Sequence, residues 1–213
     1  MQSSDSYSES IAPKPEAAIP WLPGALIVLI LLASAWILDS RGMLWWCKWD
    51  SPWILLSTDV WSKHNSQHLF DPYAWSHFQH GLIFFWFFYL LGRKRLSVWW
   101  LLVFAVALES GWELLENSPL IIDQYRENTA SLEYYGDSIL NSLGDVLACV
   151  IGFWVAAKLK FRYALACFVS IELIMIFTIH DSLLINILML TYPLDVIKNW
   201  QMSAAYLAGA HLA

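Results

Sequence analysis

The chain has few charged residues. Only 14% of its 213 residues are Asp, Glu, Lys or Arg, whereas soluble domains average about 25%. Hydrophobic residues make up 58% of the chain, and its mean hydropathy is +0.49. This composition excludes a disordered chain and disfavours an ordinary soluble domain.

Basic residues and cysteines are also scarce. Twelve Lys and Arg stand against 18 Asp and Glu, which gives a formal net charge of -6. A protein that binds nucleic acid needs a basic surface, so we expect no nucleic-acid partner. Cys47, Cys149 and Cys167 are too few and too scattered for a disulfide framework or a zinc knuckle.

Long apolar runs are what the sequence does contain. A membrane-spanning helix needs about 20 mostly apolar residues. The segments that approach this length are about 21–38, 74–92, 96–116, 136–157 and 161–179. Residues 182–192 are apolar but short, and we interpret them as an interfacial or re-entrant helix, with a sixth span as the alternative. The sequence therefore predicts an all-α fold, a polytopic integral membrane helical bundle of five spans over residues 21–201.

The ends of the chain and its basic residues predict an orientation. Residues 1–20 are rich in Ser, Pro, Ala and Glu, which is typical of a disordered tail, and residues 202–213 form a second tail. Two short connections hold half of the basic residues, namely Arg93, Lys94, Arg95, Lys158, Lys160 and Arg162. Cytoplasmic loops retain Lys and Arg. We therefore expect a multi-pass protein of the bacterial inner membrane with a cytoplasmic N-terminus.

Ionisable side chains occur inside the predicted spans. Each costs roughly 2.5–3.5 kcal/mol at the centre of a span, so such groups face the protein interior and pair. Glu109, Glu113 and Glu116 are spaced i, i+4, i+7, which places them on one helical stripe. His77 and His80 lie one turn apart at the start of the preceding segment.

A third polar group lies on the fourth segment. Asp137, Asn141 and Asp145 are spaced i, i+4, i+8 and share a broad helical face. The predicted topology places all three groups in the outward half of the membrane. The sequence therefore predicts a single polar pocket that opens to the periplasm. Arg126 is the only basic residue of loop 117–135, so it is the candidate counter-charge or anion clamp.

This pocket suggests an enzyme that acts on a lipid-linked or amphipathic envelope substrate in the lipid bilayer. Glu109, Glu113 and Asp137 are the catalytic candidates, because buried carboxylates with separated pKa values serve as acid and base. His77 and His80 are the candidate ligands of a divalent metal ion that activates water.

The remaining pocket residues are binding candidates. They are Glu116, Asn117, Tyr125, Arg126, Asn141 and Asp145. The sequence leaves two alternatives open. One is a non-catalytic binding or assembly protein whose polar network holds helices together. The other is proton or ion translocation.

Four further residues are interpreted one by one. Gly81 lets a neighbouring helix approach closely. Glu172 lies in the middle of the fifth segment without an evident partner. We interpret His64 and His68, in the first outer loop, as surface residues rather than ligands.

Three motifs carry a resemblance to a known family. They are NSQHLFDPYAWSHFQHG at 65–81, ESGWELLEN at 109–117 and YYGDSILNSLGD at 134–145. Together they resemble an uncharacterised family of bacterial multi-pass membrane proteins, mainly from alphaproteobacteria. A looser resemblance is to the VanZ-like membrane proteins, through His77-Phe78 and the D-x-x-x-N-x-x-G pattern that begins at Asp137. The VanZ likeness implies a setting at the cell envelope.

Overall fold

The structure is a computed structural model that describes residues 20–49, 55–92, 95–132 and 134–207. The helices in this part of the chain are α1 (Trp21–Ser40), α2 (Ala74–Leu91), α3 (Val98–Glu116), α4 (Pro119–Asn128), α5 (Ile139–Lys158), α6 (Phe161–Ile179), α7 (Leu183–Thr191) and α8 (Asp195–Leu207). The only β-type pairing among the described residues is an isolated bridge between Leu56 and Phe70. The all-α prediction is confirmed.

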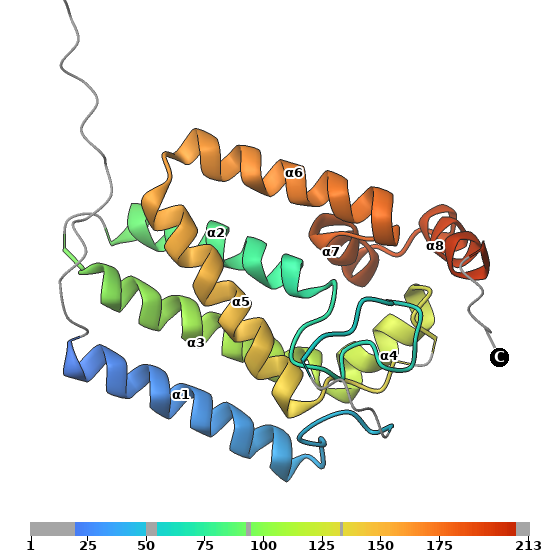
Figure 1. Cartoon of the computed structure of the whole chain (residues 1–213), viewed down its shortest axis with the longest axis horizontal. Coiled ribbons are helices and arrows are strands. Elements are labelled where there is room, and N and C mark those ends of the chain that lie inside the picture. The colour runs from blue at the N-terminus through green and yellow to red at the C-terminus, as the bar shows by residue number, and fades with distance from the viewer. Residues whose placement is uncertain (1–19, 50–54, 93–94, 133, 208–213) are drawn as a thin grey trace, which may run out of the picture.

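The long helices lie along one axis. Figure 1 shows α1, α2, α3, α5 and α6 running from side to side in alternating directions, while α4, α7 and α8 gather at one end of the bundle. We call this end the α4 end. The chain leaves α1 and α3 there and enters α2 and α5 there, so polar residues at those helix ends are brought together.

Four helices are long and apolar enough to cross a membrane, namely α1, α3, α5 and α6. This is consistent with a helical membrane bundle. The second predicted span corresponds to α2, which is not among the four because its first turns carry polar residues such as His77, Gln79 and His80. Helix α2 nevertheless lies in the middle of the bundle against α5.

Two predicted boundaries differ from the observed ones. The fourth segment was predicted to start at residue 136, but its helix, α5, begins at Ile139. The reason is that Ser138 has an extended backbone and its Oγ accepts a hydrogen bond from the amide of Asn141 at 3.1 Å. Residues 202–207, assigned to a tail, continue α8, whose buried face includes Gln201 and Ala205. The predicted N-terminal tail up to residue 19 and residues 208–213 lie outside the described residues.

Helices α2 and α5 pack unusually closely. A Cβ added to Gly81 of α2 would lie 2.0 Å from the backbone oxygen of Cys149, and one added to Gly152 of α5 would lie 2.0 Å from that of Phe78. One turn further on, the rings of Phe85 and Phe153 meet edge to face at 5.2 Å. The expected role of Gly81 is therefore observed, and this contact fixes how the polar ends of α2 and α5 face each other.

Candidate functional site

Three helices bring the predicted polar groups together at the α4 end. Helix α2 supplies His77 and His80, α3 supplies Glu109 and Glu113, and α5 supplies Asp145. The shortest contacts between these side chains range from 2.6 to 3.9 Å. The convergence expected from the helical spacing is thus present in the structure.

Glu109 is the centre of this cluster. Its Oε1 lies 2.6 Å from Nδ1 of His77, and its Oε2 lies 3.0 Å from Nδ1 of His80. The carboxylate is fully buried. Because an ionised carboxylate only accepts hydrogen bonds, each histidine carries its proton on Nδ1 and presents Nε2 to its surroundings. Glu109 therefore orients both rings.

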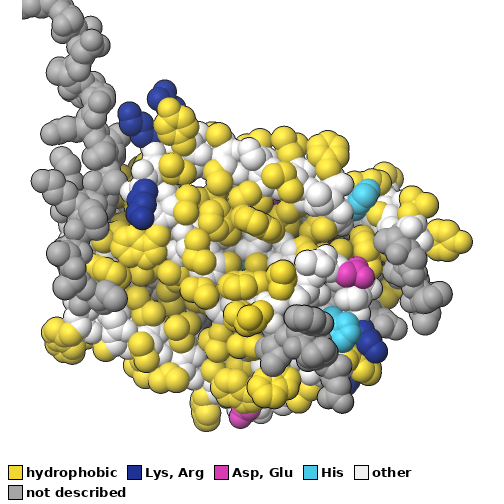
Figure 2. Space-filling view, viewed as in Figure 1, with side chains coloured by type: hydrophobic (Ala, Val, Ile, Leu, Met, Phe, Trp, Pro, Cys, Tyr) yellow, Lys and Arg dark blue, Asp and Glu magenta, His cyan; other side chains and the backbone are white. Residues whose placement is uncertain are grey.

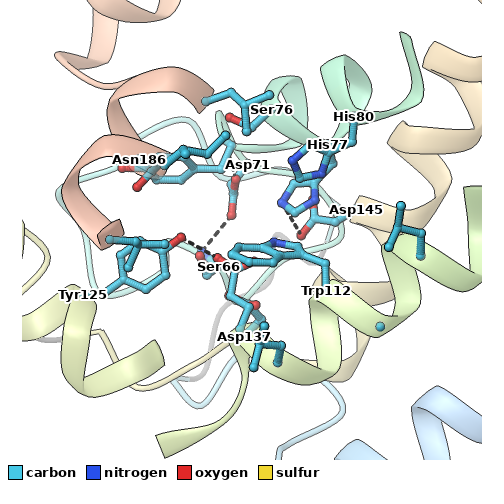
Figure 3. Close-up of a pocket in the computed structure, with 18 of the residues that line it drawn as sticks. Ser66, Asp71, Ser76, His77, His80, Trp112, Tyr125, Asp137, Asp145 and Asn186 are labelled. Carbon is cyan, nitrogen blue, oxygen red and sulfur yellow. Dashed lines mark hydrogen bonds and ion pairs between the residues drawn. The ribbon is translucent and has the colours of Figure 1, made fainter. Parts of the chain in front are cut away.

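The opposite edge of His77 faces a second acid. Its Nε2 lies 3.9 Å from Oδ2 of Asp145, which is too long for a hydrogen bond. Figure 3 shows the two side chains approaching each other from α2 and α5 at the cavity wall. Two ligands of a shared ion have a comparable separation, since a ligand atom binds zinc at about 2.0–2.2 Å.

Several buried carboxylate oxygens lack a hydrogen-bond partner among the described residues. They are both oxygens of Glu113, Oε2 of Glu116 and Oδ1 of Asp145. Oε1 of Glu113 lies 3.3 Å from Nδ1 of His77, but that nitrogen is bonded to Glu109. Atoms of His77, Glu113 and Glu116 that could bind a metal ion all lie within 4.8 Å of one another. Burial of an unpaired carboxylate is costly, so these oxygens point to a cation or a proton.

The other half of the site is held by hydrogen bonds. Asn117 caps the end of α3, accepts the amide of Asp137 at 2.6 Å and donates to its Oδ2 at 2.9 Å. The hydroxyl of Tyr134 donates to Oδ1 of Asp137 at 2.8 Å. Asp137 is therefore fully engaged, and Asn117 positions it. Asp137 thus differs from Glu113, Glu116 and Asp145, each of which has a buried oxygen without a hydrogen-bond partner among the described residues.

Asp71 is an acid that the sequence reasoning missed. It accepts the amides of Ser66 at 2.9 Å and Tyr73 at 2.7 Å, and Asn141 reaches it at 3.4 Å. Burial raises its pKa above the ordinary range, partly offset by the amide of Tyr73. The signal for it was its place directly before the proline that precedes α2.

A cavity with a volume of about 620 Å³ lies beside this cluster. Its polar side includes His77, His80, Glu116, Asp137 and Asp145. Its other side is apolar and comes from three helices, with Ile83 and Phe84 of α2, Leu108 and Leu115 of α3, and Ile187 and Leu190 of α7. Trp112 of α3, drawn in Figure 3, also lines the cavity, and its ring meets that of His80 edge to face at 6.3 Å.

The apolar side is open to the outside of the bundle. Ile83, Leu108, Leu115 and Ile187 each leave two fifths or more of their surface exposed. In a membrane bundle such side chains contact acyl chains. The cavity is therefore amphipathic, with acids at its base and apolar residues toward the surface of the bundle.

The predicted binding residues of the α3–α5 loop lie in two places. Tyr125 lines the cavity and donates to Oε1 of Glu116 at 2.9 Å. Arg126 instead donates from Nε to the backbone oxygen of Tyr134 at 2.6 Å, and its guanidinium carbon lies 5.0 Å from the ring centre of Tyr135. The guanidinium of Arg126 thus stabilises the conformation of the loop between α3 and α5.

Glu172 has partners that the sequence did not reveal. Its Oε1 accepts from Gln79 at 2.9 Å and from the amide of Leu183 at 3.1 Å, and its Oε2 accepts from the amide of Leu184 at 3.3 Å. These amides belong to the first turn of α7, which has no acceptor within its own helix. Glu172 therefore caps α7.

The burial of His68 contradicts the prediction made from the sequence. It was interpreted as a surface residue, yet only 2% of it is exposed. Asn141 donates to its backbone oxygen at 2.7 Å, and the amide of Ser138 donates to Ser66 at 2.9 Å. These bonds draw the loop onto the start of α5 and bury the ring.

Comparison with known proteins places this geometry in a family. Residues 38–203 match the family described as Protein of unknown function (DUF2585). The chain therefore belongs to the DUF2585 family. This stretch includes every residue of the cavity. The family description does not name the VanZ-like proteins, so that likeness stays a prediction.

Members of the family occur in alphaproteobacteria. The UPF0314 protein of Brucella anthropi is 40% identical over 193 residues, which is 89% of this chain and 95% of the relative. That of Paracoccus denitrificans is 40% identical over 178 residues, covering 83% and 90%. That of Agrobacterium fabrum is 48% identical over 138 residues, covering 64% and 69%. No solved structure matches the chain.

Proposed function

We propose that this protein is a divalent-cation-dependent hydrolase of the bacterial inner membrane that acts on an amphipathic, lipid-linked envelope substrate. The observation that carries the proposal is the set of unpartnered, buried carboxylate oxygens beside His77. A purely structural network would pair these oxygens with donors.

The residues fit a cation of the Mn²⁺ or Zn²⁺ type. His77 would bind through Nε2 together with Asp145, and Glu116 offers a further oxygen. Imidazole and carboxylate ligands suit these ions. Glu109 would act behind His77, since a carboxylate on the second ring nitrogen fixes the tautomer and the direction of a metal-binding histidine.

A bound cation would lower the pKa of a water molecule, which is the chemistry that it supplies. In our proposal Glu113 accepts the proton when the water oxygen attacks the ester carbon or phosphorus of the substrate. The bond to the leaving oxygen then breaks, and that oxygen takes the proton back from Glu113. Asp137, the third catalytic candidate of the sequence, is held by Asn117 and Tyr134 and shapes the site.

The substrate class follows from the two sides of the cavity. Acyl chains of the bilayer would enter along the exposed apolar residues of α2, α3 and α7, which would bring the polar end of the molecule to the acids. In an orientation with the α4 end in the periplasm, Lys158, Lys160 and Arg162 lie at the cytoplasmic end. Figure 2 shows Lys and Arg side chains gathered where α5 passes into α6. The positive-inside rule supports this orientation.

Mn²⁺ binding tests the proposal. Purified protein in detergent is titrated with Mn²⁺, and free Mn²⁺ is measured by electron paramagnetic resonance. We expect one tight site in the wild type, at least tenfold weaker binding in Asp145→Asn, and no change in the control Asp195→Asn, whose acid lies in the exposed first turn of α8. A free ligand concentration of about 100 times the dissociation constant stabilises the folded protein by about 2.7 kcal/mol. The wild type should therefore also melt at a higher temperature when Mn²⁺ is present.

One result would overturn the proposal and favour the alternative. If the wild type binds no more Mn²⁺ than Asp145→Asn, and the variant only lowers the melting temperature, the acids form a structural network. Ion translocation has less support, because Glu172, the buried acid of α6, is used to cap α7.

A further inference from the structure

A second group of metal-binding side chains lies outside the cavity. It consists of Cys47, which follows α1, and of His64 and His68, which precede α2. One ligand atom from each lies within 4.8 Å of the others, and Sγ of Cys47 is 3.2 Å from Nδ1 of His64. The loop thus brings residues 17 to 21 positions apart to one point.

The group contains an unexplained buried nitrogen. His68 is 2% exposed, and its Nδ1 is buried without a hydrogen-bond partner in the part of the chain that the structure describes. A buried imidazole nitrogen without a partner is costly, and a metal ion would satisfy the ring. A hydrogen-bonded pair of Cys47 and His64 alone would leave this nitrogen unexplained.

We propose that Cys47, His64 and His68 bind one Zn²⁺ ion, at a site independent of the cavity. Ligand atoms on a tetrahedral zinc ion lie roughly 3.3–3.8 Å apart, so the observed spacing needs only a small contraction. Cys and His side chains are the ligands that zinc prefers, and three of them leave the fourth position to water.

The site would fasten the wall of the cavity. The segment between His64 and α2 contains Ser66 and Asp71, both of which line the cavity. His68 itself accepts from Asn141 of α5 through its backbone oxygen. An ion that ties this segment to Cys47, in the stretch that follows α1, holds the polar side of the cavity against α5. Its role is therefore structural.

Cobalt spectroscopy tests the site, because a thiolate bound to Co²⁺ gives a charge-transfer band in the near ultraviolet. Purified, reduced protein is loaded with Co²⁺, and Zn²⁺ is then used to displace it. We expect the band in the wild type and in the control Cys167→Ser, whose part-buried thiol lies in α6. Cys47→Ser should lose the band, and its Zn²⁺ affinity should fall by at least tenfold.

Two further variants keep the test decisive. His68→Gln should lose the band, and His64→Gln, at a less buried position, serves if the first variant does not fold. Asp145→Asn should keep the band while losing Mn²⁺, which separates this site from the cavity. A wild-type protein without the band, or a band that persists in Cys47→Ser, would overturn the zinc assignment. In that case alkylation of Cys47 at neutral pH would point to a reactive Cys–His pair.

Discussion

Replacement of Gly81 by alanine is expected to separate α2 from α5. The added Cβ would lie 2.0 Å from the backbone oxygen of Cys149 and 2.5 Å from the backbone nitrogen of Phe153. Neither atom belongs to a flexible side chain, so the helices must move apart by roughly 1.5 Å to reach ordinary contact distances of about 3.5 Å. Overpacking of this kind costs about 1–3 kcal/mol or more.

Gly111 provides a matched control. It is also a helical glycine beside the cavity, but a Cβ added there meets no atom within 4 Å. Alanine is more favourable than glycine inside a helix by about 0.5–1 kcal/mol. Gly111→Ala should therefore be neutral or slightly stabilising. Because both glycines are helical, this preference is common to the two variants, which should differ by the overpacking cost of about 1–3 kcal/mol.

The assay is thermal unfolding in detergent. A change of 1 kcal/mol shifts the melting temperature of a protein of this size by about 2–4 °C, so Gly81→Ala should melt roughly 2–12 °C below Gly111→Ala. Gly152→Ala should resemble Gly81→Ala, because its Cβ meets the backbone of Phe78 at 2.0 Å. Equal melting temperatures for Gly81→Ala and Gly111→Ala would refute the close packing of α2 on α5.

Two more predictions concern groups behind the cavity. Burial raises the pKa of Asp181 from 3.8 to about 7. The folded state therefore binds a proton more tightly than the unfolded state. The contribution of this carboxyl to stability falls as pH rises from about 4 to about 7. The melting temperature of Asp181→Asn relative to wild type should therefore increase over that range; a constant difference would contradict the shift. Glu172→Ala removes the acceptor of two amides in the first turn of α7 and should cost about 1–3 kcal/mol in thermal unfolding. Glu172→Gln, which keeps one acceptor oxygen, should lose less, and an unchanged melting temperature in Glu172→Ala would show that α7 needs no cap.

The helical part of the site could be predicted from the sequence. Spacing places Glu109 and Glu113 on one stripe, and the alternation of helix directions brings that stripe to the ends that carry His77 and Asp145. Both arguments need only the period of the helix and the order of the spans.

The remaining part depends on how loops fold back, which has no periodic signal. Asp71 enters the site because Ser66 and Asn141 hold its segment against α5. His68 becomes buried for the same reason. Glu172 finds its partners only because the backbone of His180 adopts a left-handed conformation, with φ at 55°, that turns the chain toward α7.

The capping of α7 makes one side of the cavity depend on a residue of another helix. Helix α7 provides one side of the cavity through Leu183, Asn186 and Ile187, yet the carboxylate that holds its first turn belongs to α6 and does not line the cavity. The position of this side of the cavity thus depends on a residue that does not line it. Mutagenesis restricted to the residues that line the cavity would overlook Glu172, although a change there should displace the first turn of α7.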